Sequence, residues 1–168
     1  MRTSLYALAL VLVVGACGRK KTSDDKSSSS AADKPAAAAT LSCAKLMPAA
    51  ITDKYLAGFQ LKESDRSFDH THQCHYQQNG NLVSVDVNCN QADKRDSEPE
   101  TMKKAMNATD VAGVGKTALL IKTSVTTQYD VWDDDTPCHI LVTAGSVPSD
   151  PLAFTKDVVG SISPSTIQ

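Results

Sequence analysis

The sequence predicts an α+β fold: an antiparallel sheet of about five strands with two or three helices packed on it and two disulfides. Segments that alternate apolar and polar residues, such as Val83-Ser84-Val85-Asp86-Val87, indicate strands with one buried face. A segment near the C-terminus has apolar residues that recur every four positions, which indicates an amphipathic helix. Four cysteines share this part of the chain, so the domain is expected to be braced by disulfides.

The N-terminus has the pattern of an export signal that ends at a cysteine. Arg2 precedes an apolar stretch, Leu5 to Val14, which is much shorter than the roughly 20 residues that a membrane-spanning helix needs. Gly15-Ala16 lies directly before Cys17 and resembles the lipobox of bacterial lipoproteins, so residues 1–16 are predicted to be a signal peptide. A diacylated Cys17 would be a stable membrane anchor. We therefore expect a lipid-anchored protein of the cell envelope, on a periplasmic or extracellular face.

An ordinary secretory signal with an incidental cysteine is the alternative, and the composition of the next segment argues against it. Residues 17–41 include a four-serine run, Ser27 to Ser30, and an alanine run, Ala36 to Ala39, with almost nothing apolar to bury. This composition is typical of a disordered tether. A tether of this length spans about 25–30 Å on average, which would hold the folded part clear of the bilayer.

Residues 42–168 are expected to fold as a single domain. Their length is normal for one hydrophobic core. They contain 11 basic and 16 acidic residues, so the domain carries a net charge of −5. A nucleic-acid partner is not expected for such a domain.

The first predicted elements are a helix and a hairpin. Pro48 to Ala57 reads as a helix, since Ile51 and Tyr55 lie four positions apart and Gly58 follows its end. Gln73 to Gln78 and Leu82 to Cys89 read as the strands of the hairpin.

The hairpin turn is predicted at Asn79-Gly80, the strongest short signal of its kind. A two-residue type I′ turn places Gln78 opposite Asn81. In this register, Tyr76 faces Val83, Cys74 faces Val85 and His72 faces Val87.

The remaining elements follow from caps and alternation. Ser97 to Glu100 reads as a capping box that starts a helix running to Met106. Ser149-Asp150-Pro151 is expected to cap a final helix in which the apolar positions are Phe154, Val158 and Ile162. Three further strands are predicted over Ala118–Lys122, Thr126–Trp132 and Cys138–Thr143, with a solvated turn at Asp133–Pro137 between the last two.

Cys43, Cys74, Cys89 and Cys138 are expected to form two disulfides, because exported chains meet an oxidising compartment. The hairpin register leaves Cys74 and Cys89 about 13 Å apart along the strands, whereas the Cα atoms of a disulfide lie within about 7 Å. This excludes one of the three pairings. Of the other two, we predict Cys43–Cys74 with Cys89–Cys138, and the crossed pairing stays open.

The histidines suggest a metal site, which is the runner-up hypothesis for function. If Asp69 to His75 is extended, His70 and His72 project from one face of a strand, and Asp69 could complete a site for Zn²⁺ or Cu²⁺. Exposed or half-buried histidines that bind no metal are the simpler interpretation. His75 would point the other way, and His139 lies far along the chain.

Three other patterns are weaker. Gly113-Val114-Gly115-Lys116-Thr117 lacks the first glycine of a phosphate loop, whose position is held by Asp110, so a tight turn is expected. Asp133-Asp134-Asp135 could bind Ca²⁺, but adjacent carboxylates cannot all turn inward, and a solvated turn is expected instead. A ligand groove could be lined by aromatic residues, although a small core is the simpler interpretation of Tyr129, Trp132 and Phe154.

The pattern of the domain resembles a known family. The residues that carry the resemblance are Cys43, Leu46 and Gly58, the triplet Cys74-His75-Tyr76, and Val111 to Gly115 before a strand and a closing helix. Together they look like the domain of unknown function of many small actinobacterial lipoproteins, which is similar to the extracellular sensor domain of some mycobacterial serine/threonine kinases. The match covers most of residues 42–162, but Tyr76 stands where the family usually has tryptophan, and the second cysteine pair is extra.

The resemblance implies an antiparallel sheet with helices packed on it and no established activity, so it transfers no functional residues. Family members with two cysteines keep the equivalents of Cys43 and Cys74, which supports the predicted pairing. No Gly-x-Ser-x-Gly elbow occurs, and the cysteines that could act as nucleophiles are expected to be bridged. We therefore expect a non-catalytic binding or sensing module without a cofactor, whose partner is an extracytoplasmic protein or small ligand.

Overall fold

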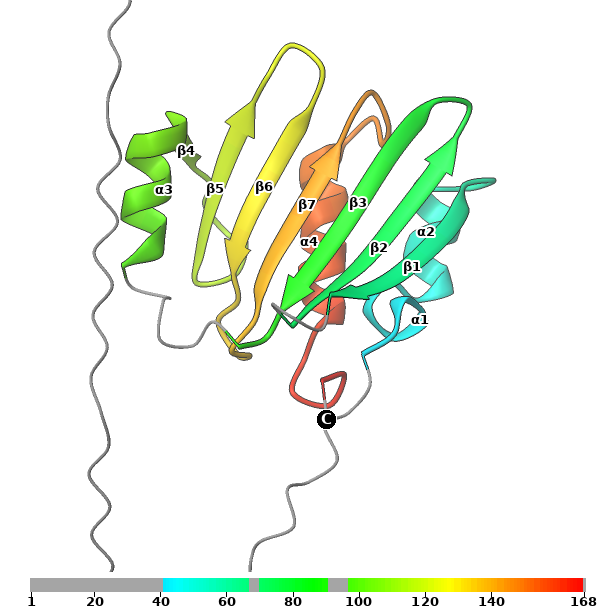
Figure 1. Ribbon diagram of the computed structural model, residues 1–168, viewed down its shortest axis with the longest axis horizontal. Helices are drawn as coiled ribbons and strands as arrows, with labels where there is room; N and C mark the ends of the chain where they lie inside the picture. The colour runs from blue at the N-terminus through cyan, green and yellow to red at the C-terminus, as the bar shows by residue number, and fades with distance from the viewer. Residues whose placement is uncertain (1–40, 67–69, 91–96, 168) are drawn as a thin grey trace, which may run out of the picture. The chain divides into compact units, whose positions relative to one another are not determined.

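The computed structural model describes residues 41–66, 70–90 and 97–167, which build one antiparallel sheet with helices on both faces (Figure 1). The sheet has seven strands in the order β1-β2-β3-β7-β6-β5-β4. The α+β class and the antiparallel sheet are confirmed. The expected number of about five strands is wrong, and four helices are present in the described residues where two or three were expected.

The strands are β1 (Gln60–Arg66), β2 (Thr71–Gln78), β3 (Asn81–Asn88), β4 (Thr109–Asp110), β5 (Thr117–Lys122), β6 (Thr127–Trp132) and β7 (His139–Ala144). The helices are α1 (Cys43–Leu46), α2 (Ala49–Tyr55), α3 (Glu98–Met106) and α4 (Pro151–Ser161). Each predicted helix and strand is present within a few residues of its expected bounds.

The unpredicted strands, β1 and β4, lack an apolar alternation. Leu61 is the only apolar residue of β1, and its side chain is 45% exposed. β1 lies at an edge of the sheet and β4 has only two residues, so neither needs a buried apolar row. Charged side chains are a normal protection of an edge strand. The same property hides such a strand from sequence patterns.

The β2–β3 hairpin has the predicted register. Gln78 pairs with Asn81, Cys74 with Val85 and His72 with Val87. Both turn residues have positive φ, 50° at Asn79 and 80° at Gly80, as a type I′ turn requires.

One face of the sheet, here called the covered face, packs against α1, α2 and α4, which lie behind the strands in Figure 1. Alternate residues of the central strands supply its side chains, because successive residues of a strand point to opposite faces. The fully buried strand residues of this core are Cys74, Val83, Val85, Val87, Val131, Ile140 and Val142. Phe154 and Val158 of α4 pack on them, and the rings of Phe154 and Tyr55 meet edge to face at 5.3 Å.

A second, smaller core lies on the opposite face, under α3. Leu119, Ile121 and Trp132 point to this side, where Ala108 and Met102 pack on them. α3 therefore covers only the β5 end of that face.

The predicted capping box is wrong, since the Ser97 side chain makes no cap hydrogen bond. The cap of α4 is confirmed, because the Asp150 carboxylate accepts a 2.9 Å hydrogen bond from the Ala153 N–H.

The two predicted disulfides, Cys43–Cys74 and Cys89–Cys138, are both confirmed. The first ties α1 to β2 on the covered face. The second joins the residue after β3 to the residue before β7, and these two strands are neighbours in the sheet.

Candidate functional site

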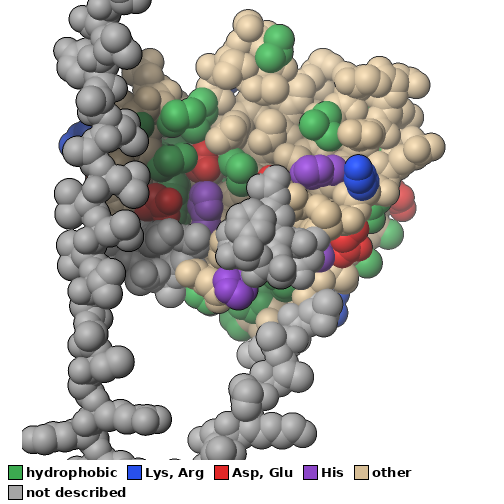
Figure 2. Space-filling model, viewed as in Figure 1, with side chains coloured by type: hydrophobic (Ala, Val, Ile, Leu, Met, Phe, Trp, Pro, Cys, Tyr) green, Lys and Arg blue, Asp and Glu red, His purple; other side chains and the backbone are tan. Residues whose placement is uncertain are grey.

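The part of the second face that α3 leaves uncovered, here called the open face, carries mainly polar side chains. The space-filling view shows histidine and acidic side chains gathered on it (Figure 2). Two cross-strand rows form its centre. One row holds Lys62, His75, Ser84, Thr143 and Gln128, and the next holds Ser64, Gln73, Asp86, Leu141 and Asp130.

Two histidine–aspartate pairs lie on the open face. The Nε2 atom of His75 is 3.4 Å from Oδ1 of Asp86, and Nε2 of His139 is 3.3 Å from Oδ1 of Asp130. Both aspartates are cross-strand neighbours of Leu141, one on each side, so the two pairs flank this residue. The four side chains come from β2, β3, β6 and β7, which only the folded sheet brings together.

The pair around Asp130 is the more buried of the two. The Asp130 side chain is 2% exposed, and its Oδ2 atom accepts a 2.9 Å hydrogen bond from the Gln128 amide. The indole of Trp132 stacks on His139 with 4.6 Å between the ring centroids. Among the described residues, the buried Nε1 of Trp132 has no hydrogen-bond partner. A buried donor of this kind is a feature that a ligand or water could satisfy.

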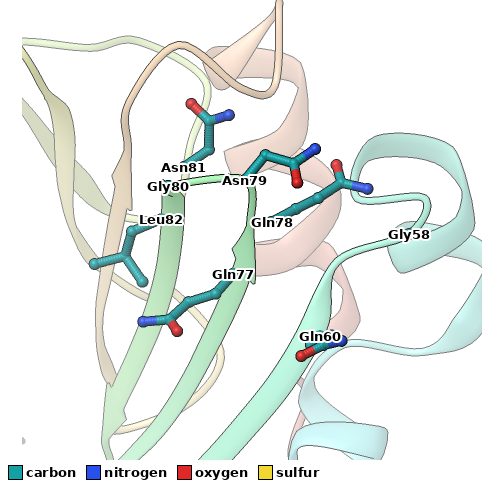
Figure 3. Close-up of a pocket in the computed structure, with 8 residues that line it drawn as sticks. All are labelled: Gly58, Gln60, Gln77, Gln78, Asn79, Gly80, Asn81 and Leu82. Atoms are coloured by element: carbon teal, nitrogen blue, oxygen red, sulfur yellow. The ribbon is translucent and has the colours of Figure 1, made fainter.

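An amide-rich hollow adjoins the open face at the β2–β3 turn. Its volume is about 520 Å³, and its polar lining consists of Gln60, Gln77, Gln78, Asn79 and Asn81 (Figure 3). Gly58 makes room for Gln78, since a Cβ atom at Gly58 would lie 2.5 Å from the Gln78 Nε2. Amide groups both donate and accept hydrogen bonds, so this hollow suits neutral polar ligands such as hydroxyl groups or peptide groups.

His70 and His72, the predicted metal ligands, have different surroundings. His72 is buried on the covered face, and its Nε2 atom is 2.7 Å from Oε1 of Glu63. His70 is exposed and precedes β2, with a φ of 57°. The strand geometry on which the prediction rests therefore does not extend to His70. Asp69 lies outside the described residues, so the predicted His70–His72 site stays a prediction.

The Asp133 turn differs from expectation. The prediction of a solvated turn is wrong for Asp133, which is buried, although Asp134 and Asp135 are exposed. Burial raises the pKa of Asp133 to about 6, although the Thr136 hydroxyl donates a hydrogen bond to the carboxylate and opposes the shift. Asp133 continues the alternation of Val131 onto the covered face.

Two other predictions can be compared with the structure. Gly113 and Gly115 have positive φ values of 72° and 53°, so the tight turn is confirmed. A Cβ atom at Gly115 would lie 2.7 Å from the Trp132 carbonyl oxygen. Tyr129 and Phe154 lie in the main core and Trp132 lies in the second core, as the simpler interpretation predicts.

None of the four residues that form the histidine–aspartate pairs is a predicted site residue. His75 was set aside because it points away from His72, and that direction is what brings it to Asp86. The predicted β6–β7 hairpin already contained a signal for the second pair. Its register pairs Asp130 with Leu141 and Trp132 with His139, so Asp130 and His139 are diagonal neighbours on the same face of the sheet.

Comparisons with models of protein families, with curated proteins and with solved structures found no match. The resemblance to the actinobacterial lipoprotein domain stays a prediction. Cys17 and the expected signal peptide and tether lie outside the described residues. Within the residues described, none of the helices is long and apolar enough to cross a membrane.

Proposed function

We propose that the protein is a membrane-anchored lipoprotein of the cell envelope that binds or senses an extracytoplasmic protein or small ligand without catalysing a reaction. The observation that carries the proposal is the open face, where cross-strand pairing holds polar groups in fixed positions. Groups held in place before a ligand arrives lose little entropy when they bind it. The adjoining amide hollow enlarges the same surface.

The open face is more accessible to a partner than the covered face. The helices α1, α2 and α4 cover one side of the sheet, whereas α3 covers only the β5 end of the other. Surfaces built from a few convergent polar groups on rigid elements are typical of binding sites. The partner is therefore expected to contact Gln77, Leu82 and the residues around the two histidine–aspartate pairs.

The anchor is tested by fractionation of cells that express the full chain. Cys17→Ser should move the protein from the membrane pellet to the soluble fraction or leave the precursor unprocessed, because the thiol is the site of lipid attachment. Mass spectrometry of the mature N-terminus is the independent measurement. An unmodified N-terminus away from Cys17 would refute the anchor.

Binding through the open face is tested by photo-crosslinking in intact cells. A benzophenone amino acid replaces Leu82, whose side chain is 45% exposed beside the amide hollow. The matched control carries the same group at Ala50, an exposed position of α2 on the covered side. We expect a discrete adduct from position 82 that position 50 does not give. Equal adducts from both positions, or none from position 82, would contradict binding at this face.

A further inference from the structure

The Cys43–Cys74 disulfide lies beside two side chains, His72 and Glu63, of types that can serve as metal ligands. The Sγ atom of Cys43 is 3.7 Å from Nε2 of His72, and the ligand atoms of Cys43, His72 and Cys74 all lie within 4.8 Å of one another. Oε1 of Glu63 is 2.7 Å from the same His72 nitrogen. Two sulfurs, one imidazole and one carboxylate thus meet at one point of the fold.

We propose that these four residues form a Zn²⁺ site when the Cys43–Cys74 disulfide is reduced. Zinc in structural sites is four-coordinate and tetrahedral, and its ligands are cysteine thiolates, histidine nitrogens and carboxylates. Zinc bonds of about 2.0–2.3 Å place neighbouring ligand atoms roughly 3.2–3.8 Å apart in a tetrahedron. The observed 3.7 Å between Cys43 and His72 already has this spacing. The two sulfurs must move apart, and Oε1 of Glu63 must move from 2.7 Å to this spacing from the His72 nitrogen.

The site would form by thiol–disulfide exchange followed by metal binding. A dithiol reductant, such as an envelope oxidoreductase, gives two electrons and two protons to the disulfide and becomes a disulfide itself. Each of the two cysteines is then a thiol. Zn²⁺ binds the thiolates, and both thiol protons leave to solvent. The bridge and the metal therefore exclude each other.

The surroundings support a metal site at this position. The backbone N–H of Cys43 donates a 2.8 Å hydrogen bond to Oε1 of Glu63, which orients the carboxylate toward His72. Partners of this kind fix the direction of metal ligands. Cys43, His72 and Cys74 are buried, whereas the Glu63 side chain is 39% exposed on edge strand β1, so the site opens to solvent through Glu63.

A hollow of about 340 Å³ also reaches the bridge. It is lined in part by Cys43, Met47, Leu61 and Tyr76. Because β1 is an edge strand and α1 has only four residues, the elements around this hollow have few neighbours to hold them closed. Cys43 and Cys74 are fully buried, so a reductant reaches the sulfurs only when these edge elements open, and the centre of the sheet can stay closed.

The test is a Co²⁺ titration of the full chain carrying Cys17→Ser, which removes the one cysteine that belongs to neither bridge. Co²⁺ reports thiolate ligands by a charge-transfer absorption band, and Zn²⁺ should displace it, as expected from the relative affinities of the two metals. We expect no band from the oxidised protein. After reduction with a phosphine, we expect a band that saturates at one Co²⁺ per chain.

Matched variants identify the ligands. His72→Gln and Glu63→Gln should each weaken Co²⁺ binding by more than the roughly 10–100-fold that is typical of outer-shell residues. His75→Gln is the control, since His75 lies on the same strand but on the open face. Cys43→Ser with Cys74→Ser should abolish the band, and Cys89→Ser with Cys138→Ser should keep it. His70→Ala should change nothing, which separates this site from a His70–His72 chelate.

Reduction could itself loosen the domain, and this outcome is also informative. Metal binding is then coupled to folding, so stoichiometric Zn²⁺ should restore the far-ultraviolet dichroism and a cooperative melting transition. The proposal is overturned if the folded reduced protein gives no thiolate band, if His72→Gln leaves the band unchanged, or if Zn²⁺ fails to restore an unfolded reduced chain.

Discussion

The two faces of the sheet achieve burial by different means. On the covered face, Val83, Val85 and Val87 of β3 are fully buried among apolar neighbours. On the open face, Ser84 of the same strand is only 8% exposed, and Asp130 of β6 is 1% exposed. Apolar groups are stabilised by leaving water, whereas polar groups must find hydrogen bonds or ion pairs when they leave it.

The difference separates stability from recognition. The covered face is expected to supply most of the free energy of folding, since apolar burial contributes roughly 25 cal/mol per Å². The polar groups of the open face contribute little net stability, because folding exchanges their hydrogen bonds with water for similar bonds within the protein. The identity of these polar groups can therefore be determined by binding to a partner, because changing it costs little stability.

The largest expected effect is on the covered face. Phe154→Ala removes a fully buried ring of α4 and should lower the free energy of unfolding by about 3–5 kcal/mol. Leu82→Ala, at an exposed position of the open face, should change it by less than about 0.5 kcal/mol. Urea denaturation of both variants measures the difference. Effects of equal size would contradict the division of roles between the faces.

Removal of a disulfide should have the next largest effect. The bridges close loops of 31 and 49 residues. The chain-entropy model assigns roughly 3–4 kcal/mol to each, because the stabilisation rises only slowly with loop length. Paired serine substitutions at Cys43 and Cys74, or at Cys89 and Cys138, should therefore be similar in thermal unfolding. A much larger loss for one pair would show that native contacts near that bridge dominate over loop closure.

Asp133 should make stability depend on pH. Its pKa is raised by burial from 3.8 to about 6, so the folded chain binds this proton more tightly than the unfolded chain. The stability that this proton contributes is present at low pH and is lost as the pH rises from about 4 to about 6, by about 1–3 kcal/mol.

The variant Asp133→Asn has no proton to lose at this position. As the pH rises through this range, the parent should therefore lose unfolding free energy relative to the variant. Urea titrations at several pH values measure this difference. An identical pH profile for both proteins would show that the covered face does not desolvate the carboxylate.

The smallest expected effect distinguishes the two histidine–aspartate pairs of the open face. The side chains of Asp130 and His139 are 2% and 20% exposed, whereas those of Asp86 and His75 are 16% and 30% exposed. Double-mutant cycles with Asp→Asn and His→Gln should give a coupling of roughly 1–2 kcal/mol at Asp130–His139. The more exposed pair should stay below about 1 kcal/mol, because solvent screens it. A larger coupling at His75–Asp86 would reverse this ranking.

The sequence by itself determined the features that depend on neighbours along the chain. The Asn79-Gly80 turn requires positive φ, and its two-residue length sets the register of β2 against β3. That register excluded the Cys74–Cys89 bridge. The Asp150 cap and the four-residue apolar repeat of α4 are equally local.

Only the tertiary structure decided which polar residues meet. Glu63 reaches His72 because β1 pairs with β2 in one particular register, and β1 has no apolar row that could reveal it. Asp133 is buried because of where its strand end packs, although its sequence is that of a solvated turn. Period-2 alternation assigns a side chain to one of two faces, but it does not say which face a helix will cover. That choice depends on long-range packing, so the chemistry of both faces became visible only in the folded chain.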